Sequence, residues 1–241
     1  MPNYKANFNY FDKIDDEEKA YWLGFIWADG YVCKRNRKNR IEYNLKLSLQ
    51  PNDESHIQKL IDCLDGNYPI HTYKSKGFEN VIGIEKRLFL TNQHMCSLLY
   101  EKYGIVPNRH DPGRLINAIP KEFYRYFILG LFDADGSFTS YQGSYGEKLS
   151  VCFGGSKEII DFIENYFDEI GLSPKSNRGK EQRHKDKDGF WLSTKYCGIP
   201  QGSKILNWLY RDSKIHLDRK YEKYLSIPYI REHKIGTWKN R

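Results

Sequence analysis

Apolar and polar residues follow two different periods along this chain, one typical of strands and one typical of helices. In residues 40–50 the two classes alternate strictly, with apolar side chains at Ile41, Tyr43, Leu45, Leu47 and Leu49. This period of two predicts a strand with one buried face. Residues 15–29 instead begin with acidic residues and continue as an apolar run. Because acidic side chains favour the positive end of a helix, this segment is predicted to be helical.

Both ends of this first helix carry recognisable signals. Asp15 and Glu18 have the spacing of a capping box, in which two side chains bind the first free backbone amides. Gly30 follows the last apolar positions, and glycine readily adopts the left-handed conformation that closes many helices. We therefore expect the helix to begin after Asp15 and to end near Gly30.

The remaining pattern predicts the order helix, two strands, helix, two strands, helix, and predicts it twice. In the first half these elements are helix 15–29, strands 31–35 and 40–50, helix 53–64, strands 68–77 and 81–92, and helix 93–104. In the second half they are helix 121–136, strands 137–143 and 148–155, helix 156–171, strands 173–179 and 189–198, and helix 203–213. The polar run 180–188 is interpreted as the connection between the last two strands.

The two halves also share a sequence motif. The segment "LGFIWADG" at residues 23–30 has a near copy, "LGLFDADG", at residues 129–136, which is an offset of 106 residues. A period of this length is too long for a solenoid and indicates two domains related by a pseudo-twofold axis. The predicted domains are residues 1–110 and 120–225, joined by a proline-rich linker at 111–119 and followed by a basic tail at 226–241.

Composition narrows the class of partner. The chain is 39% hydrophobic and 15% aromatic, so it can build packed cores and is not a disordered protein. It carries 38 Lys and Arg against 31 Asp and Glu, a net charge of +7. This excess favours a polyanionic partner such as nucleic acid, although charge alone leaves open a basic protein without one.

Cysteines and hydropathy indicate the compartment. The five cysteines are scattered and show no C-x-x-C spacing, so they are interpreted as reduced core residues rather than zinc ligands. The chain has no apolar run of the about 18 residues that a membrane span requires, and its first residues lack the apolar segment of a secretory signal. A cytoplasmic, organellar or nucleoid-associated protein is expected, neither secreted nor bound to a membrane.

The repeated segment carries the candidate chemistry. Each of its two helices presents a pair of small residues four positions apart on one face; these are Gly24 and Ala28, and Gly130 and Ala134. Two such faces can cross in close contact and bring Asp29 and Asp135 together at the negative ends of two helices. Two carboxylates in that position repel each other unless a cation lies between them. Oxygen ligands favour an ion such as Mg²⁺ over zinc.

The two segments "WLGFIWADG" (22–30) and "ILGLFDADG" (128–136) resemble the motif of the LAGLIDADG homing endonucleases in their single-chain form with two motifs. The resemblance extends to the element order, to "LYEKYGIVPN" (99–108) and to "LYRDSKIHLDRKYEKY" (209–224), and it covers residues 10–225. It implies an α+β fold of two pseudo-twofold-related αββαββα repeats packed through the motif helices. Each repeat would contribute a curved antiparallel sheet to a DNA-binding saddle.

The resemblance also implies an activity. Proteins of this family are metal-dependent endodeoxyribonucleases that hydrolyse phosphodiester bonds on both strands of a long, site-specific duplex target. The cuts lie across the minor groove and leave short 3′ overhangs. By this resemblance the protein is expected to act as a monomer without an obligate protein partner.

The family's site residues can be transferred by position. The metal-binding acids fall on Asp29 and Asp135, assisted by the backbone carbonyls of Ala28 and Ala134, with Mg²⁺ as the cofactor and Mn²⁺ expected to substitute. The sixth motif position is acidic in the second copy, Asp133, whereas the first copy has Trp27 there. We interpret Asp133 as an acid that caps the turn at the end of the helix.

Many relatives place further polar or basic residues at the ends of the second and fourth strands, where they act on the attacking water. Gln50 fits the second strand of the first repeat, with Gly154 as its expected counterpart. Lys195 fits the fourth strand of the second repeat, with Lys86 or Arg87 as candidates in the first. Gln50 and Lys195 are therefore added to the predicted catalytic residues.

Reading of the DNA sequence would fall to the strands, since every second side chain of a sheet in the major groove can face base edges. In the first repeat the predicted DNA contacts are Arg40, Glu42, Asn44, Lys46 and Ser48, with Lys34, Arg35, Arg37, Lys38, Lys74 and Lys76 nearby. In the second repeat they are Ser140, Gln142, Lys148, Ser150, Arg178, Lys180 and Arg183. Because the two sets differ, the expected target is asymmetric.

Two other functions are compatible with the same scaffold. An RNA maturase, which assists intron splicing, would share the basic surface, so intron RNA stays a possible partner. A non-catalytic DNA-binding regulator would usually lack the paired acids, so the presence of Asp29 and Asp135 argues against it.

Overall fold

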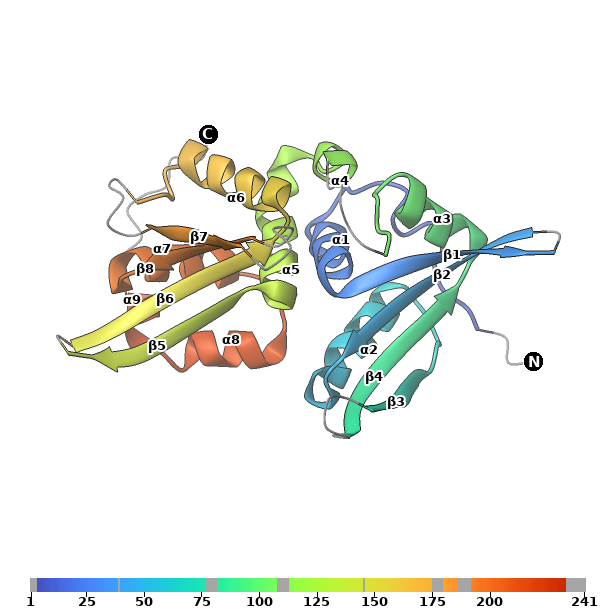
Figure 1. Cartoon of the computed structure of the whole chain (residues 1–241), viewed down its shortest axis with the longest axis horizontal. Helices are drawn as coiled ribbons and strands as arrows, with labels where there is room; N and C mark the ends of the chain where they lie inside the picture. Colours follow the sequence, from blue (N-terminus) through green and yellow to red (C-terminus); the bar gives the residue numbers. More distant parts are fainter. Residues whose placement is uncertain are drawn as a thin grey trace. The chain divides into compact units, whose positions relative to one another are not determined.

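The computed structural model describes residues 4–38, 40–76, 82–107, 113–144, 146–174, 180–185 and 192–232. The chain divides into two compact units, Met1–Phe127 (unit 1) and Ile128–Arg241 (unit 2). Each unit contains a four-stranded antiparallel sheet with helices packed against it (Figure 1). The predicted α+β class with two antiparallel sheets is confirmed.

Unit 1 follows the predicted order closely. Its elements are α1 (Glu17–Asp29), β1 (Gly30–Arg37), β2 (Arg40–Leu49), η1 (Pro51–Asp53), α2 (Glu54–Cys63), β3 (Ile70–Lys76), β4 (Ile82–Thr91), α3 (Gln93–Glu101) and α4 (Gly113–Asn117). The strands lie in the order β1-β2-β4-β3. The helices α1, α2 and α3 contact this sheet, and the core lies against the face that carries Leu45, Leu47, Leu88 and Leu90, all fully buried.

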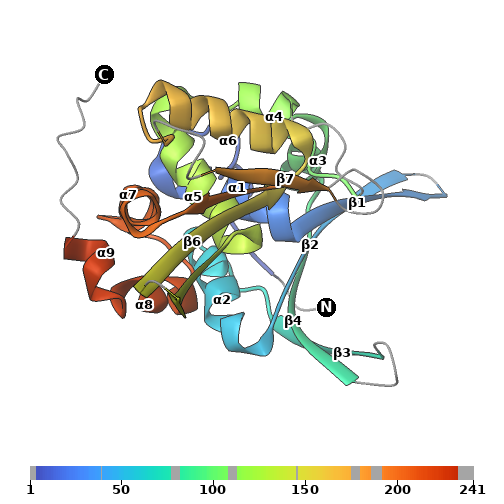
Figure 2. The same cartoon turned by 60° about the vertical axis from the view of Figure 1, so that its left-hand side comes forward.

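Unit 2 repeats this arrangement and extends it. The 3-10 turn η3 (Lys121–Phe123) leads into α5 (Tyr124–Asp135), which crosses the boundary between the units. Then follow β5 (Ser137–Gly143), β6 (Gly146–Gly155), α6 (Lys157–Glu169), β7 (Lys180–Lys185), β8 (Leu192–Cys197), α7 (Ile199–Tyr210), α8 (Asp218–Leu225) and α9 (Pro228–Glu232). The strand order is β5-β6-β8-β7. Figure 2 shows α8 and α9 beside α7.

The register of the two sheets fixes which residues are equivalent. Tyr31 pairs with Lys46 in unit 1. Ser137 and Cys152, which lie 106 residues after Tyr31 and Lys46 respectively, pair in the same way in unit 2. Lys46 pairs in turn with Phe89, and Cys152 pairs with Lys195. The internal repeat is thus confirmed at the level of individual strand pairs, and Lys195 corresponds to Phe89.

The first helix differs from its prediction at both ends. Asp16, not Asp15, is the N-cap, because its side chain accepts a hydrogen bond from the amide of Lys19 at 2.7 Å. Gly30 is not left-handed: its φ is −99° and its ψ is 170°. Glycine is required there for a different reason, since a Cβ atom would lie 2.8 Å from the carbonyl oxygen of Ile26.

The second half differs from its prediction in its third strand. That strand, β7, occupies Lys180–Lys185 inside the run interpreted as a connection, whereas residues 173 and 174 are not in a strand and 175–179 lie outside the described residues. β7 is an edge strand that pairs only with β8. An edge strand can be polar throughout, so apolar alternation does not reveal it.

The segments outside the predicted repeats also contain helices. α4 lies within residues 111–119, the stretch interpreted as a linker, and α9 lies within the predicted tail. α9 is fixed to α7 by a hydrogen bond from Asn207 Nδ2 to the carbonyl oxygen of Ile230 at 2.5 Å. None of the helices in the described part of the chain has the length and apolar character of a membrane span.

Aromatic cores hold both motif helices. In unit 1 the rings of Trp22 and Phe25 pack against His56, whose Nε2 is 2.9 Å from the hydroxyl of Tyr21. In unit 2 the ring of Phe132 packs among Phe138, Phe153 and Tyr210. These aromatic side chains are therefore core residues, and they fix the helix ends where the motif acids lie.

Candidate functional site

Each motif acid is the last residue of its helix. Asp29 ends α1 and Asp135 ends α5, and both are half-buried. The next residue is a glycine whose amide closes the helix: Gly136 N–H donates to the carbonyl of Phe132 at 2.9 Å. A Cβ at Gly136 would lie 2.7 Å from that carbonyl oxygen and 2.3 Å from the Phe132 ring. The glycine therefore allows the tight turn from helix to strand that places a carboxylate at the helix end.

The chemistry of these positions suits a hard divalent cation. Each unit offers one carboxylate next to backbone carbonyls at the negative end of a helix, and oxygen donors of this kind hold Mg²⁺. Within the described residues no group of three or more His, Cys, Asp or Glu side chains could hold a metal ion. Asp29 and Asp135 belong to different units, so a shared ion and the packing of Gly24, Ala28, Gly130 and Ala134 stay predictions.

The acid at the sixth motif position is structural. Asp133 is fully buried; its Oδ1 accepts from the hydroxyl of Tyr210 at 2.6 Å and its Oδ2 accepts from the amide of Leu217 at 2.7 Å. Burial, together with the charge of Asp133, raises the pKa of Tyr210 well above its usual value, so the hydroxyl remains the donor. Asp133 thus links the end of α5 to the end of α7 and to the start of α8. In unit 1 the same position holds the buried Trp27.

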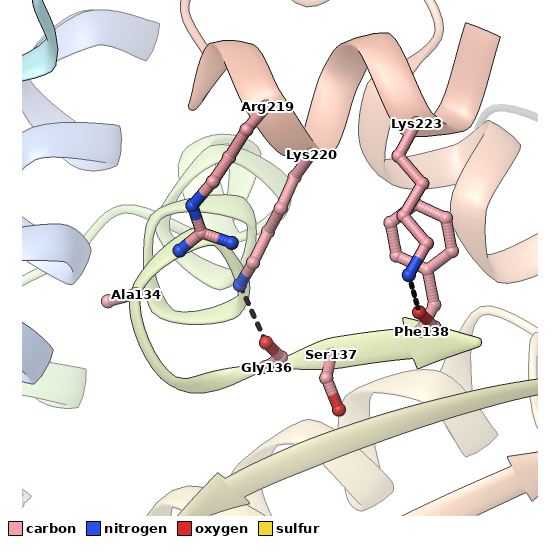
Figure 3. A pocket seen from close by; sticks show the side chains of 7 residues that line it. All are labelled: Ala134, Gly136, Ser137, Phe138, Arg219, Lys220 and Lys223. Carbon is pink, nitrogen blue, oxygen red and sulfur yellow. Dashed lines mark hydrogen bonds between the residues drawn. The ribbon is translucent and has the colours of Figure 1, made fainter. Parts of the chain in front are cut away.

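A feature that the sequence did not reveal is Lys220, in the segment "DRKYEKYL". Its ammonium group is buried and donates to the carbonyl oxygens of Phe132, Asp133 and Gly136 at 2.6, 2.7 and 2.6 Å. Figure 3 shows Arg219 and Lys220 reaching from α8 toward the end of α5. Both line a pocket of about 340 Å³ together with Ala134, Gly136, Ser137, Phe138 and Lys223. The sequence of α8 is rich in charged residues, which is typical of a helix exposed to solvent. No sequence signal therefore indicated that Lys220 is buried.

The sheet of unit 1 has an outer face, opposite its leucine core, that carries part of the predicted DNA-contacting row. By strand alternation and register this face holds Glu42, Asn44, Lys46 and Ser48 of β2, Arg35 and Arg37 of β1, and Arg87 and Phe89 of β4. Lys46 Nζ donates to the hydroxyl of Tyr31 at 2.9 Å. Asn44 is buried, with its Oδ1 2.5 Å from the hydroxyl of Thr91.

The structure separates the two basic candidates of unit 1. Arg87 lies on the outer face, where its Nε donates to Ser48 Oγ at 2.9 Å and its guanidinium lies over the Tyr73 ring. Lys86 points to the other face and forms an ion pair with Glu54 at 2.9 Å. Of the two, Arg87 is the one on the same face as Lys46.

The predicted phosphate contacts near the first hairpin are in different environments. Lys34 is on the core side of β1, paired with Glu101 at 2.8 Å, and this partner raises the pKa of Lys34. Arg37 and Arg40 both approach Glu42, at 3.4 and 4.0 Å. The side chains of Arg35, Lys38 and Lys74 are exposed. For Lys76 only the strand position is described.

The predicted contacts of unit 2 are divided between two faces. Lys148 and Ser150 lie on the face opposite Leu149 and Val151, together with Lys195. Ser140 and Gln142 lie on the other face, where Ser140 Oγ donates to Glu147 at 2.8 Å. Lys180 and Arg183 belong to β7, where only the backbone is described, and Arg178 lies outside the described residues.

The register also corrects the counterpart of Gln50. Ser48 corresponds to Gly154 by its place in the ladder, so Gln50, which is exposed and precedes η1, corresponds to Ser156. Ser156 is the N-cap of α6 and accepts from the amide of Ile159. The equivalent positions after the second strand of each unit therefore differ: Gln50 is exposed, whereas Ser156 is buried as a helix cap.

Comparisons with known proteins agree with this architecture. A family model described as a LAGLIDADG-like domain matches residues 122–217. No curated protein matches the sequence. The family-model match confirms the LAGLIDADG resemblance for the second half of the chain, where the second motif lies.

Solved structures extend the likeness to both halves. A mutant of I-SmaMI is similar with a TM-score of 0.57 and 15% identity, over 89% of this chain and 92% of that one. The LAGLIDADG homing endonuclease I-LtrWI bound to target DNA gives 0.56 and 10%, over 92% and 90%. I-SmaMI bound to cleaved DNA gives 0.54 and 14%, over 89% and 93%. At identities this low, the structural similarity shows a shared fold and nothing further.

Proposed function

We propose that this chain, which has the fold of the LAGLIDADG homing endonucleases, is itself a site-specific DNA endonuclease that cuts both strands of a long asymmetric duplex. The observation that carries the proposal is the pair Asp29 and Asp135, each the half-buried last residue of its motif helix. The net charge of +7 supports a nucleic-acid partner.

In this proposal the carboxylates of Asp29 and Asp135, with the carbonyls of Ala28 and Ala134, hold divalent metal, Mg²⁺ by preference. When bound, such an ion lowers the pKa of a coordinated water and neutralises charge on the phosphate. The side chain of Gln50 orients the attacking water, and the ammonium of Lys195 adds positive charge near the phosphate. The outer faces of the two sheets bind the DNA, with basic side chains on phosphates and polar ones on base edges.

The test requires the target. A randomised duplex library is incubated with the wild-type protein and Mg²⁺, the cleaved members are sequenced, and the recovered duplex is then used with variants. Asp29→Asn and Asp135→Asn remove a charged ligand but keep the side-chain shape. We expect each to slow cleavage by more than about 100-fold, with the loss greater on one strand than on the other.

DNA binding without metal is the control, and both variants should bind the target at least as well as the wild type. Normal cutting by both variants would contradict the assignment of the acids. If no library member is cleaved, but binding to the wild-type protein enriches a specific duplex, the protein would instead be a DNA-binding regulator.

A further inference from the structure

Lys220 has an environment that is unusual for a lysine. The residue is only 6% exposed, and its three N–H donors meet three carbonyl oxygens at hydrogen-bonding distance. The carbonyls belong to Phe132, Asp133 and Gly136, which surround the last turn of α5. The ammonium also lies 5.3 Å from the centroid of the Phe132 ring.

Burying an ammonium group is costly unless its charge is compensated. The last carbonyls of a helix have no partner within the helix and carry the negative end of its dipole. The carbonyls of Phe132 and Asp133 in the last turn of α5, and that of Gly136 directly after it, supply the missing charge. The Phe132 carbonyl also accepts from the Gly136 amide, so Lys220 adds a second, charged donor there. Lys220 therefore serves as a charged cap for α5, delivered by a different helix.

A second contact from the same segment holds the other side of this turn. Leu217, the N-cap residue of α8, donates its backbone N–H to Asp133 Oδ2, while Tyr210 at the end of α7 donates to Oδ1. The end of α5 is thus fixed by its backbone carbonyls and by one buried side chain. Asp135, its last residue, lies between the two residues Asp133 and Gly136 whose carbonyls bind Lys220.

We propose that Lys220 is a positioning residue for Asp135. By holding the carbonyls on both sides of Asp135, it sets the direction in which that carboxylate leaves the helix. The inference rests on the proposed function, in which Asp135 holds metal, and adds the device that orients it. Displacement of a catalytic group by about 1 Å can cost on the order of 100-fold in rate, so a well-fixed turn has a direct effect on cleavage.

The matched control is Lys223, on the same helix and lining the same pocket. Its ammonium donates to the carbonyl oxygen of Phe138 at 2.6 Å, in β5 rather than at the end of α5. Lys220→Met and Lys223→Met each remove one positive charge from the same region. A difference between them therefore reports the contact with α5 rather than charge.

The first measurement uses the free protein and needs no target. Hydrogen–deuterium exchange of the amides at residues 130–137 should become at least about tenfold faster in Lys220→Met, and stay at the wild-type rate in Lys223→Met. The second is single-turnover cleavage of the selected duplex with Mg²⁺. Lys220→Met should be at least about tenfold slower at saturating protein, while its Kd for the duplex without metal matches that of Lys223→Met within threefold.

Equal exchange, or equal cleavage rates, in the two variants would overturn the inference. Parallel loss of DNA affinity and of cleavage in Lys220→Met would also overturn it, because that pattern indicates general unfolding. If Lys220→Met does not fold, Lys220→Arg takes its place, since it keeps the charge but not the geometry of the three donors. It should show faster amide exchange and slower cleavage with an unchanged Kd, but with smaller changes than those expected for Lys220→Met. Wild-type cleavage by Asp135→Asn would reject the proposed function instead, whatever the exchange data show.

Discussion

At the scale of single residues, the two copies of the motif place different side chains at the same buried position. Trp27 and Asp133 occupy the same position, and both are buried. The tryptophan fills the core of unit 1, whereas the carboxylate needs hydrogen-bond donors, because a buried charge without partners is destabilising. Those donors, Tyr210 and Leu217, are 77 and 84 residues away in the chain. The sequence shows that the two copies differ at this position, but it does not indicate which distant residues bind Asp133.

Removing one donor should weaken unit 2. Tyr210→Phe keeps the ring and deletes the hydroxyl that binds Asp133 Oδ1. Hydrogen bonds to charged groups contribute about 1.5–3 kcal/mol, so we expect a loss of that size in urea unfolding at pH 8. A change below about 0.5 kcal/mol would mean that water replaces the hydroxyl without cost.

The same residue predicts a pH dependence. Because burial raises the pKa of Tyr210, the folded protein keeps this proton at a pH where an unfolded chain, with a tyrosine pKa of about 10, begins to lose it. The resulting contribution to stability is complete below about pH 10 and is lost as the pH rises toward the folded-state pKa. Between pH 8 and pH 10.5 the wild type should therefore lose more stability than Tyr210→Phe. Equal losses in the two proteins would contradict the assignment.

At the scale of elements, each unit has a row of three cross-strand neighbours that begins two residues after its motif acid. Each row contains one lysine, but the lysine lies on a different strand in each unit. In unit 1 the row is Tyr31, Lys46 and Phe89, and in unit 2 it is Ser137, Cys152 and Lys195. The cation comes from the second strand in one unit and from the fourth in the other. We therefore expect Lys46 to supply in unit 1 the positive charge that Lys195 supplies in unit 2.

Moving the charge across the pair tests this equivalence. Cross-strand neighbours have Cβ atoms about 4.5–5.5 Å apart, a distance that a lysine side chain spans. Lys46→Phe should slow single-turnover cleavage by at least about tenfold, and the double variant Lys46→Phe with Phe89→Lys should recover most of the loss. If the double variant is no faster than the single one, Lys46 acts through its contact with Tyr31 and not through its charge.

Elements with a buried apolar face were predictable from the sequence, whereas β7 and α8, which lack apolar periodicity, were not. The strands β2 and β6 and the helix α6 have periodic apolar residues because one side packs on a core. The helix α1 was recognised instead by its continuous apolar run, which is buried on all sides. β7 has no such pattern, as an edge strand of charged and polar residues. α8 buries only Lys220 and Tyr224, so its apolar stripe is absent too. The positioning device proposed above was therefore invisible in the sequence.

At the scale of the whole molecule, the repeat pattern predicted the same order of elements in both halves. The two sheets have the same strand order, and their registers are equivalent pair by pair. The two outer faces nevertheless differ chemically at equivalent positions. Lys46 and Ser48 in unit 1 correspond to Cys152 and Gly154 in unit 2, and Phe89 corresponds to Lys195. Equivalent backbones carrying different side chains cannot read the same bases, which is the physical reason for expecting an asymmetric target.

Two artificial targets test this expectation. Each half of the selected duplex is duplicated to give one palindrome per half-site, and Kd is measured for both at the same salt concentration, because phosphate contacts make affinity depend on salt. In a palindrome one unit meets a half-site selected for the other, and each wrong base pair costs about 1–3 kcal/mol. With two or more such mismatches, both palindromes should bind at least about 30-fold more weakly than the asymmetric duplex. A palindrome bound as tightly as the selected duplex would show that one unit dominates recognition and that the other contributes only phosphate contacts.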